Sequence, residues 1–145
     1  MMKFLKLLIW VIFIINLYKI SFSNENFYDE GVKLFKSTKY EEAKFLFERN
    51  IVFNPKNVDS YLYLAKIYNK KEEQTKEQQN LDTVLLIEPS NEEAILMSMK
   101  IALEKSNYSK VKNLSETFLK FCKNLCEENN VIKESLKNIE SKNES

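Results

Sequence analysis

The stretch from Phe27 to Pro55, FYDEGVKLFKSTKYEEAKFLFERNIVFNP, decides the fold. Its apolar residues recur every three or four positions on both sides of a polar SerThrLys segment at 37–39, which predicts two short amphipathic helices joined by a turn. Gly31, the only glycine in the 145-residue chain, stands inside the first helix. Glycine costs about 1 kcal/mol relative to alanine there, so we expect a neighbouring backbone to approach Gly31 closely.

The same pattern returns at a regular interval along the chain. Pro55 aligns with Pro89, Phe27 with Tyr61 and Gly31 with Ala65. A second interval reaches an apolar and aromatic set, namely Ile95, Met99, Tyr108 and Leu119. A 34-residue period with an early aromatic residue, a small residue between the helices and a final proline resembles the tetratricopeptide repeat. The resemblance implies an all-α fold, a right-handed superhelical stack of antiparallel helix pairs.

We expect three repeats of falling regularity at 24–57, 58–91 and 92–125. Glu77 stands where the family has alanine, Met99 occupies the small-residue position, and Lys123 replaces the proline. The predicted helices are 26–37, 40–53, 58–71, 76–88, 92–105 and 109–125. Capping-box spacings support three of their starts: Thr38 with Glu41, Thr75 with Gln78, and Ser90 with Glu93.

Residues 127–145 are expected to close the C-terminal end of the stack. The sequence EENN at 127–130 predicts a break, after which Ile132, Leu136 and Ile139 are spaced for one short helix. A repeat stack exposes an apolar docking surface at its end, so this helix would cap it. We expect 141–145 to be a frayed tail.

The first 23 residues are typical of a secretory signal peptide. Lys3 and Lys6 precede an unbroken apolar run from Leu7 to Ile15, and Ser21 and Ser23 fit a small-residue cleavage site. The expected mature N-terminus is Asn24, in a periplasmic or otherwise extracytoplasmic location. The alternative is an uncleaved segment that holds the chain at a membrane.

Composition lowers the expectation of catalysis. The chain has no histidine, the commonest general base and metal ligand, and one glycine cannot form a phosphate-binding loop. The net charge is only +1 and the charges are dispersed, so the chain has no overall positive electrostatic field that would attract nucleic acid. We expect no enzyme activity, no cofactor and no metal, and a protein or peptide as the partner. A cysteine-dependent enzyme is a remote alternative.

The resemblance implies that a concave groove, lined by the first helix of each repeat, binds the partner. Three rows of three residues, spaced by the repeat period, would line it: Tyr28, Leu62 and Leu96; Val32, Lys66 and Lys100; and Phe35, Asn69 and Leu103. Two rows are mainly apolar and one is basic, which suits a peptide with apolar anchors and an acidic residue. The alternative is that the apolar members pack on one another as core.

Family members that grip a terminal carboxylate do so with Lys, Arg and Asn. Here those places hold other residues: Tyr28, Val32, Tyr63, Glu93 and Met97. A docking site for cytosolic chaperone tails is therefore not expected. The expected function is an exported adaptor or assembly factor; the alternative is an anchored scaffold of an envelope complex, and self-association through an exposed repeat end stays open.

Cys122 and Cys126 lie four residues apart on the last predicted repeat helix. Two core thiols, an internal disulfide, and cross-linking or metal binding are the alternatives. The disulfide is within reach, because residues four apart on a helix have Cα atoms roughly 6 Å apart. Metal binding lacks ligands, because two cysteines are too few for structural zinc.

Overall fold

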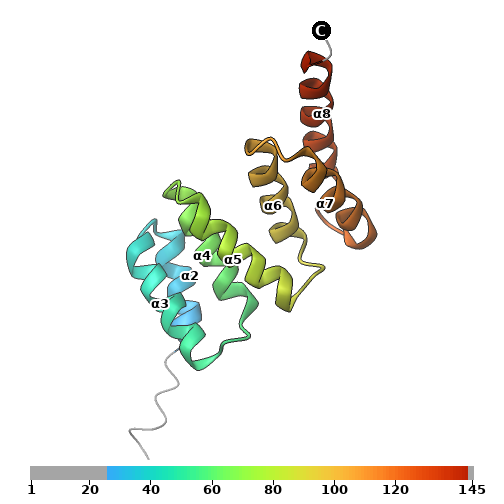
Figure 1. Ribbon diagram of the computed structural model, residues 1–145. Coiled ribbons are helices and arrows are strands. Elements are labelled where there is room, and N and C mark those ends of the chain that lie inside the picture. The colour runs from blue at the N-terminus through green and yellow to red at the C-terminus, as the bar shows by residue number, and fades with distance from the viewer. Residues whose placement is uncertain (1–25, 144–145) are drawn as a thin grey trace, which may run out of the picture.

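The computed structural model describes residues 26–143, which form seven helices and no strand (Figure 1). The predicted signal peptide and its cleavage site lie outside these residues. Within them, no helix combines the length and apolarity that crossing a membrane needs. The helices are α2 (Phe27–Lys36), α3 (Tyr40–Phe53), α4 (Val58–Lys70), α5 (Gln74–Ile87), α6 (Glu92–Glu104), α7 (Tyr108–Phe121) and α8 (Cys126–Asn143).

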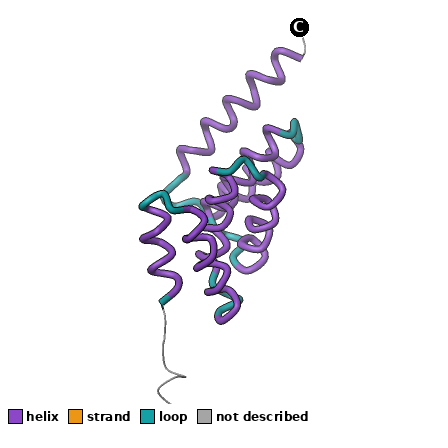
Figure 2. The backbone as a smooth tube through the Cα atoms, turned by 90° about the vertical axis from the view of Figure 1, so that its left-hand side faces the viewer, coloured by secondary structure: helices purple, strands orange, loops and turns teal. Residues whose placement is uncertain are grey.

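Successive helices run antiparallel and stack side by side in three pairs, α2 with α3, α4 with α5, and α6 with α7 (Figure 1). The final helix α8 packs against α6 and α7 and then extends beyond them toward the C-terminus, as Figure 2 also shows. The predicted all-α stack of helix pairs is confirmed.

The repeat period is visible in the backbone itself. Thr38, Glu72 and Ser106 are spaced by one period each, and each joins the two helices of one pair with a positive φ, of 61°, 59° and 55°. This left-handed conformation is where glycine is usually found after a helix. The repeat geometry therefore imposes the same turn on three different side chains, although the sequence offers no glycine for it.

The predicted capping boxes are wrong. Thr38 and Ser90 lie one residue before the N-caps of α3 and α6, and Thr75 lies inside α5. Asparagine is the residue that caps here: its side-chain oxygen accepts a backbone N–H at the starts of α2, α4, α6 and α7, from Asn26, Asn57, Asn91 and Asn107. Asparagine is among the best N-cap residues, which accounts for its use.

The C-terminal boundaries also differ from prediction. The helix α7 ends at Phe121 rather than at 125, because Cys122 has an extended backbone with φ −60° and ψ 137°. The EENN sequence is no break but part of the first turns of α8, which begins at Cys126. The helix α8 continues for 18 residues to Asn143, so it is longer than the short helix expected; the last two residues lie outside the described part of the chain.

Three hydrophobic clusters form the core, one at each junction along the stack. The first contains Ala43, Phe47, Leu64, Ile67 and Tyr68; the second contains Leu62, Ala65, Leu81, Val84, Ala94 and Ile101. The third contains Ile95, Leu96, Met99, Ala102, Val111, Phe118, Ile132 and Leu136. Each cluster draws residues from more than one helix pair or from α8, so each repeat depends on its neighbour for burial.

Gly31 makes room for a side chain rather than for a backbone. A Cβ at Gly31 would lie 2.9 Å from Cε1 of the fully buried Phe47. The expected close approach exists, but its partner is the ring of the facing helix. Met99, at the equivalent position of the third repeat, is itself fully buried in the third core cluster, so this position of the repeat is not restricted to small residues.

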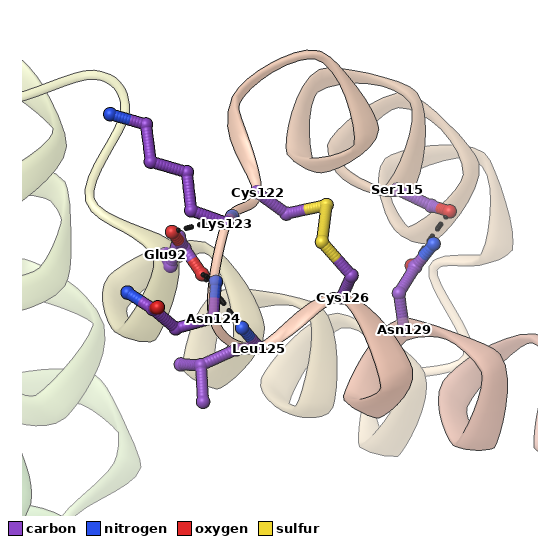
Figure 3. The surroundings of a disulfide bond; sticks show 8 residues. All are labelled: Glu92, Ser115, Cys122, Lys123, Asn124, Leu125, Cys126 and Asn129. Atoms are coloured by element: carbon purple, nitrogen blue, oxygen red, sulfur yellow. Dashed lines mark hydrogen bonds between the residues drawn. A yellow bond between two sulfur atoms is a disulfide. The ribbon is translucent and has the colours of Figure 1, made fainter.

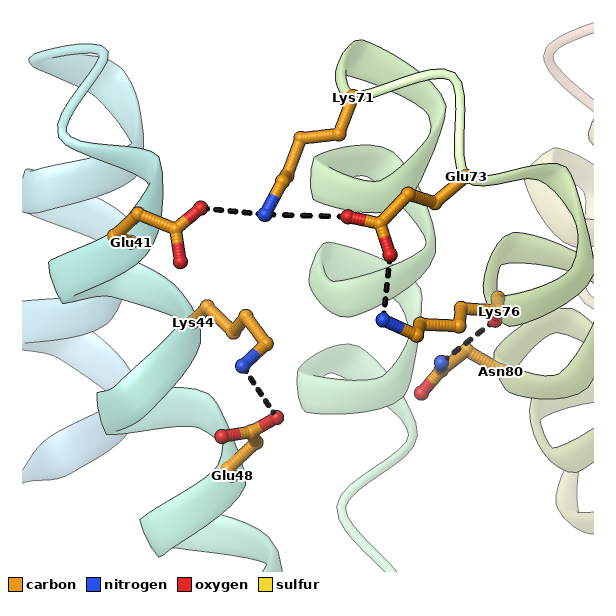
Figure 4. Close-up of polar contacts among 7 residues, drawn as sticks. All are labelled: Glu41, Lys44, Glu48, Lys71, Glu73, Lys76 and Asn80. Atoms are coloured by element: carbon orange, nitrogen blue, oxygen red, sulfur yellow. Dashed lines mark hydrogen bonds and ion pairs between the residues drawn. The ribbon is translucent and has the colours of Figure 1, made fainter.

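Charged side chains connect the first two pairs on the outer side of the stack (Figure 4). Lys71 Nζ lies 2.6 Å from Glu41 Oε1 of α3 and 3.2 Å from Glu73 Oε1. Hydrogen bonding to Lys71 lowers the pKa of the Glu41 carboxyl. All these groups are solvent-exposed or nearly so, and exposed ion pairs contribute little to stability, so the core fixes the stack.

Candidate binding groove

The nine residues predicted to line a groove lie on the first helix of each pair, α2, α4 and α6. They fall into three environments: an aromatic cluster at the N-terminal end, the core, and a polar hollow between α4 and α6. Leu103 is half-buried against the third core cluster.

The aromatic cluster is centred on Tyr63 of α4. Its ring lies 4.9 Å from Phe47, 5.0 Å from Phe35 and 6.1 Å from Tyr28, measured between centroids. Burial, with the charge of Asp59 as a second cause, raises the pKa of Tyr28 to about 12. Tyr28, Val32 and Phe35 are therefore half-buried by mutual packing and present only part of their surface to a partner.

Leu62 and Leu96 belong to the core. They are only 7% and 6% exposed, within the second and third clusters. An apolar row open to solvent was the wrong prediction for these two positions. The physical reason is that Leu62 packs in one cluster with residues of α6 from the next pair, and Leu96 packs in one cluster with residues of α8. What remains of the Leu62 surface lines a hollow described below.

The hollow between α4 and α6 has a volume of about 350 Å³ and gathers four of the predicted residues, Phe35, Lys66, Asn69 and Lys100. Lys70, Glu77, Glu93, Met97, Ile101 and Glu104 complete its lining. Phe35, Met97 and Ile101 supply an apolar part, and the other lining side chains supply polar and charged groups. We call this site the α4–α6 hollow.

The charges of the α4–α6 hollow are partly paired. Lys66 Nζ lies 2.8 Å from Glu93 Oε2 and 5.0 Å from the centre of the Tyr63 ring. Glu104 accepts a hydrogen bond of 2.6 Å from Gln74. Lys70 and Lys100 are exposed and pair with no acid in the described part of the chain. The hollow thus contains two ammonium groups without an acidic partner among the described residues, those of Lys70 and Lys100, and one paired ammonium group, that of Lys66.

Glu77 is a residue of the α4–α6 hollow that sequence reasoning did not single out. It is 4% exposed and accepts a hydrogen bond of 3.1 Å from Asn69 Nδ2. Burial raises the pKa of its carboxyl, although the Asn69 hydrogen bond opposes this. The sequence did contain a signal for this residue, namely a glutamate at a position where the repeat family has alanine. A buried carboxylate at such a position needs a polar partner.

A second hollow, of about 600 Å³, lies between the start of α6 and the turn that joins α7 to α8. Glu93 lines both hollows, so they adjoin at the Lys66–Glu93 ion pair. The lining is Leu62, Glu88, Ser90–Glu93, Lys120, Phe121 and Lys123–Leu125. We call these two adjoining hollows together the groove.

Glu92 lines the second hollow and binds the turn between α7 and α8, as Figure 3 shows for its contacts with Lys123, Asn124 and Leu125. Its carboxylate accepts backbone N–H groups from Lys123, Asn124 and Leu125, at 2.9, 3.1 and 2.9 Å. These hydrogen bonds, that from Leu125 first, lower the pKa of Glu92. No sequence motif could have indicated this contact, because its partners are backbone atoms from the far end of the same repeat.

A disulfide joins Cys122 and Cys126 across the same turn (Figure 3). Their Cα atoms are 5.4 Å apart, and Cys122 follows α7 while Cys126 begins α8. The prediction that both lie on one helix is wrong, because the turn held by Glu92 separates them. With both sulfurs in the bond, neither cysteine is a free thiol in this structure.

Catalytic and metal-binding arrangements are not apparent in this groove. Among the described residues no three His, Cys, Asp or Glu side chains cluster as metal ligands would. The buried Glu77 accepts a hydrogen bond from Asn69, and Glu104 of the same hollow is occupied by a hydrogen bond from Gln74, so the two carboxyl groups are not arranged around a nucleophile. What the arrangement can do chemically is hold a segment that carries both apolar and charged side chains.

No protein-family model matches the chain, and no curated protein matches its sequence. Solved structures do. The Yersinia enterocolitica type III secretion chaperone SycD, in complex with a peptide of the translocator YopD, has a TM-score of 0.70 at 15% identity, covering 82% of this chain and 93% of that one. The first TPR of Spaghetti (RPAP3), bound to the HSP90 peptide SRMEEVD, has 0.68 at 18%, covering 78% and 90%.

The Sgt2 TPR domain from Aspergillus fumigatus has a TM-score of 0.68 at 14% identity, covering 83% of this chain and 82% of that one. These similarities define the class of fold: an α-solenoid of tetratricopeptide-like helix pairs. The likeness inferred from the repeat period is thereby confirmed in three dimensions.

Proposed function

We propose that this protein is an exported interaction module, an adaptor or assembly factor that docks a segment of another protein in the groove along α2, α4 and α6. The observation that carries the proposal is the α4–α6 hollow, where Phe35, Met97 and Ile101 lie beside the unpaired Lys70 and Lys100. Two similar structures were solved with peptides bound, one of YopD and one of HSP90.

The chemistry of the groove indicates an extended or helical peptide with apolar anchors and at least one acidic residue. Apolar side chains would fill the part of the α4–α6 hollow lined by Met97 and Ile101, and a carboxylate would pair with Lys100. The family places that would grip a terminal carboxylate hold Tyr28, Val32, Tyr63, Glu93 and Met97. An internal acidic residue therefore suits this groove better than a chain terminus.

The proposal of export rests on the first 23 residues, with release after Ser23 as the first expectation. N-terminal sequencing of protein from its native host tests this, because an N-terminus at Asn24 supports release. A disulfide also suits an oxidising compartment outside the cytoplasm. We propose no catalytic activity, since both cysteines, the only nucleophile candidates singled out, lie in that disulfide.

Site-specific photocrosslinking in the native compartment tests the docking proposal. A photoreactive benzophenone side chain replaces Met97 in the α4–α6 hollow in one version of the chain. In the control it replaces Phe45 of α3, which is 60% exposed and lies outside the hollows. The proposal expects a specific protein adduct from position 97 and none from 45. Adducts from 45 alone would place docking on the outer surface.

A second candidate function, the membrane-anchored scaffold, is favoured by one observation. Several large apolar side chains are exposed at the edge of the stack where α2 begins and residues 1–25 join it. If those residues are retained, this edge would lie close to the bilayer. N-terminal sequencing separates the two candidates, since retention of Met1 supports the scaffold.

A further inference from the structure

Exposed apolar side chains gather at one edge of the stack. Eight large apolar residues in the described part of the chain are exposed, and six of these stand in the last three residues of α3, α5 and α7. They are Val52, Phe53, Leu86, Ile87, Leu119 and Phe121. We call this set the apolar edge; the other two, Phe45 and Val131, lie elsewhere on their helices.

The repeat period places the set on one edge. Val52 and Leu86 are one period apart, as are Phe53, Ile87 and Phe121 in succession. Since α3, α5 and α7 run in the same direction, their C-terminal ends point to the same side (Figure 1). Val52 and Leu86 are 77% and 82% exposed, so they contribute little to the core, and the fold does not require apolar residues there.

The chain enters the stack at the same edge. The helix α2 begins at Phe27, whose ring stacks on that of Phe53 with centroids 5.8 Å apart, and Arg49 lies 4.4 Å above the Phe27 ring. Figure 1 shows the start of α2 on the side where α3, α5 and α7 end. Residues 1–25 therefore join the folded part beside the apolar edge.

The sequence that precedes this entry point is itself apolar. The run Leu7–Ile15 ends 12 residues before Phe27, and 12 extended residues reach at most about 40 Å. If the run is held in a bilayer, the apolar edge is the part of the stack tethered nearest to it. Charges beside the edge are mixed, with Lys56 and Lys120 against Glu88, so anionic lipid is not required.

We propose that the apolar edge is a lipid-contact surface that lies against the bilayer when residues 1–25 are retained as an anchor. Six side chains from three helix ends, separated by polar loops, suit the boundary between headgroups and acyl chains rather than insertion into the bilayer. Such a contact would turn the groove toward proteins near the membrane. Phe121 also lines the second hollow of the groove, but Val52 and Leu86 line neither hollow, so probes at these two positions test the lipid contact separately from the docking proposal.

Spin-label accessibility on the full-length chain tests this surface. The chain is reconstituted into phosphatidylcholine vesicles, and a nitroxide label is attached to an introduced cysteine without reductant, so that the Cys122–Cys126 disulfide stays closed. Leu86→Cys and Val52→Cys probe the apolar edge. Phe45→Cys is an exposed apolar control away from it, and Lys105→Cys probes the turn at the opposite edge.

If the lipid-contact proposal is right, adding vesicles lowers the accessibility of labels at positions 52 and 86 to a water-soluble nickel complex and raises their accessibility to oxygen. Labels at positions 45 and 105 should show neither change. Equal aqueous accessibility at all four positions would overturn it, as would failure of the chain to join the vesicles. Spin–spin broadening at 52 and 86 without vesicles would instead assign the apolar edge to a second copy of the chain.

Discussion

Lys66 Nζ lies 2.8 Å from Glu93 Oε2 at the point where the two hollows of the groove meet. A cation predicted to receive a partner's carboxylate thus already has an acidic neighbour. A partner must compete with Glu93 for Lys66, whereas Lys100 is uncommitted among the described residues. In the groove, Lys66 is therefore paired with an internal acid, whereas Lys100 is available to a partner's carboxylate.

Removing the internal acid should strengthen docking. Glu93→Gln keeps the size of the side chain but frees Lys66, and exposed ion pairs are typically worth at most about 1 kcal/mol. We expect affinity for an acidic partner to rise by about threefold, measured by calorimetry with the protein captured at position 97. Glu42→Gln, which breaks an exposed pair with Lys39 on α3, is the control and should leave affinity unchanged.

Gly31→Ala tests the contact with Phe47. Overpacking costs about 1–3 kcal/mol and the helical gain from alanine is about 1 kcal/mol, so we expect a net loss of about 1 kcal/mol in the free energy of unfolding. The Phe47 ring has little freedom to move, because it is fully buried and stacks on Tyr63 at 4.9 Å. Urea denaturation measures the effect.

The matched background for this test is Phe47→Leu, which removes the ring that a Cβ would meet. In that background Gly31→Ala should be neutral or stabilising. A stabilising effect of Gly31→Ala in the wild-type background would mean that the ring does not explain the glycine.

Glu77 should make stability depend on pH. Its folded-state pKa is raised above the ordinary 4.5, so the folded state disfavours the charged form. This penalty is absent below pH 4.5 and grows as pH rises through the folded-state value. Glu77→Gln should therefore stabilise the chain at pH 7 and have little effect near pH 4, as measured by urea denaturation. The exposed Glu116→Gln is the control, and an equal gain at both pH values would contradict the account.

The Cys122–Cys126 disulfide should stabilise the C-terminal end selectively. It closes a loop of only about five residues, for which loop entropy gives about 2 kcal/mol. Replacing both cysteines by serine should speed hydrogen exchange in α8 while α2 and α3 keep their protection. Uniform loss along the stack would show that the repeats unfold together.

Glu92 should act on the same turn through its charge. Its folded-state pKa is lowered, so its contribution is present above pH 4.5 and is lost as pH falls through the folded-state value. In Glu92→Gln, exchange in α8 should already be fast at pH 7 and should lose this acid dependence. Unchanged protection in the variant would remove Glu92 from the account of the turn.

The period and the apolar spacing predicted most of the fold because repeated helix pairs bury the same positions each time. The start of α8 escaped prediction because the turn before it depends on Glu92, a residue distant in sequence. The asparagine caps escaped it because Thr and Ser pairs nearby had the expected spacing. Local patterns thus fixed the elements but not their ends.

The groove was predictable where it depends on shared helix faces. Lys66, Asn69 and Lys100 do meet in one hollow, because residues one period apart occupy equivalent places. The prediction that Leu62 and Leu96 line an open groove was wrong, because periodicity does not tell which apolar residues the next helix pair covers. Glu77 enters the site from α5, a helix outside the predicted rows.

The charge-reversal variant Lys66→Glu with Lys100→Glu tests the central claim most directly, that this groove docks a partner through its basic row. Its affinity for the protein captured at position 97 is measured by calorimetry, beside Lys56→Glu with Lys137→Glu, which changes the same charge at exposed positions outside both hollows. The account predicts that the first variant loses binding while its circular dichroism stays that of the wild type, and that the second binds normally. Wild-type affinity in the first variant would contradict it.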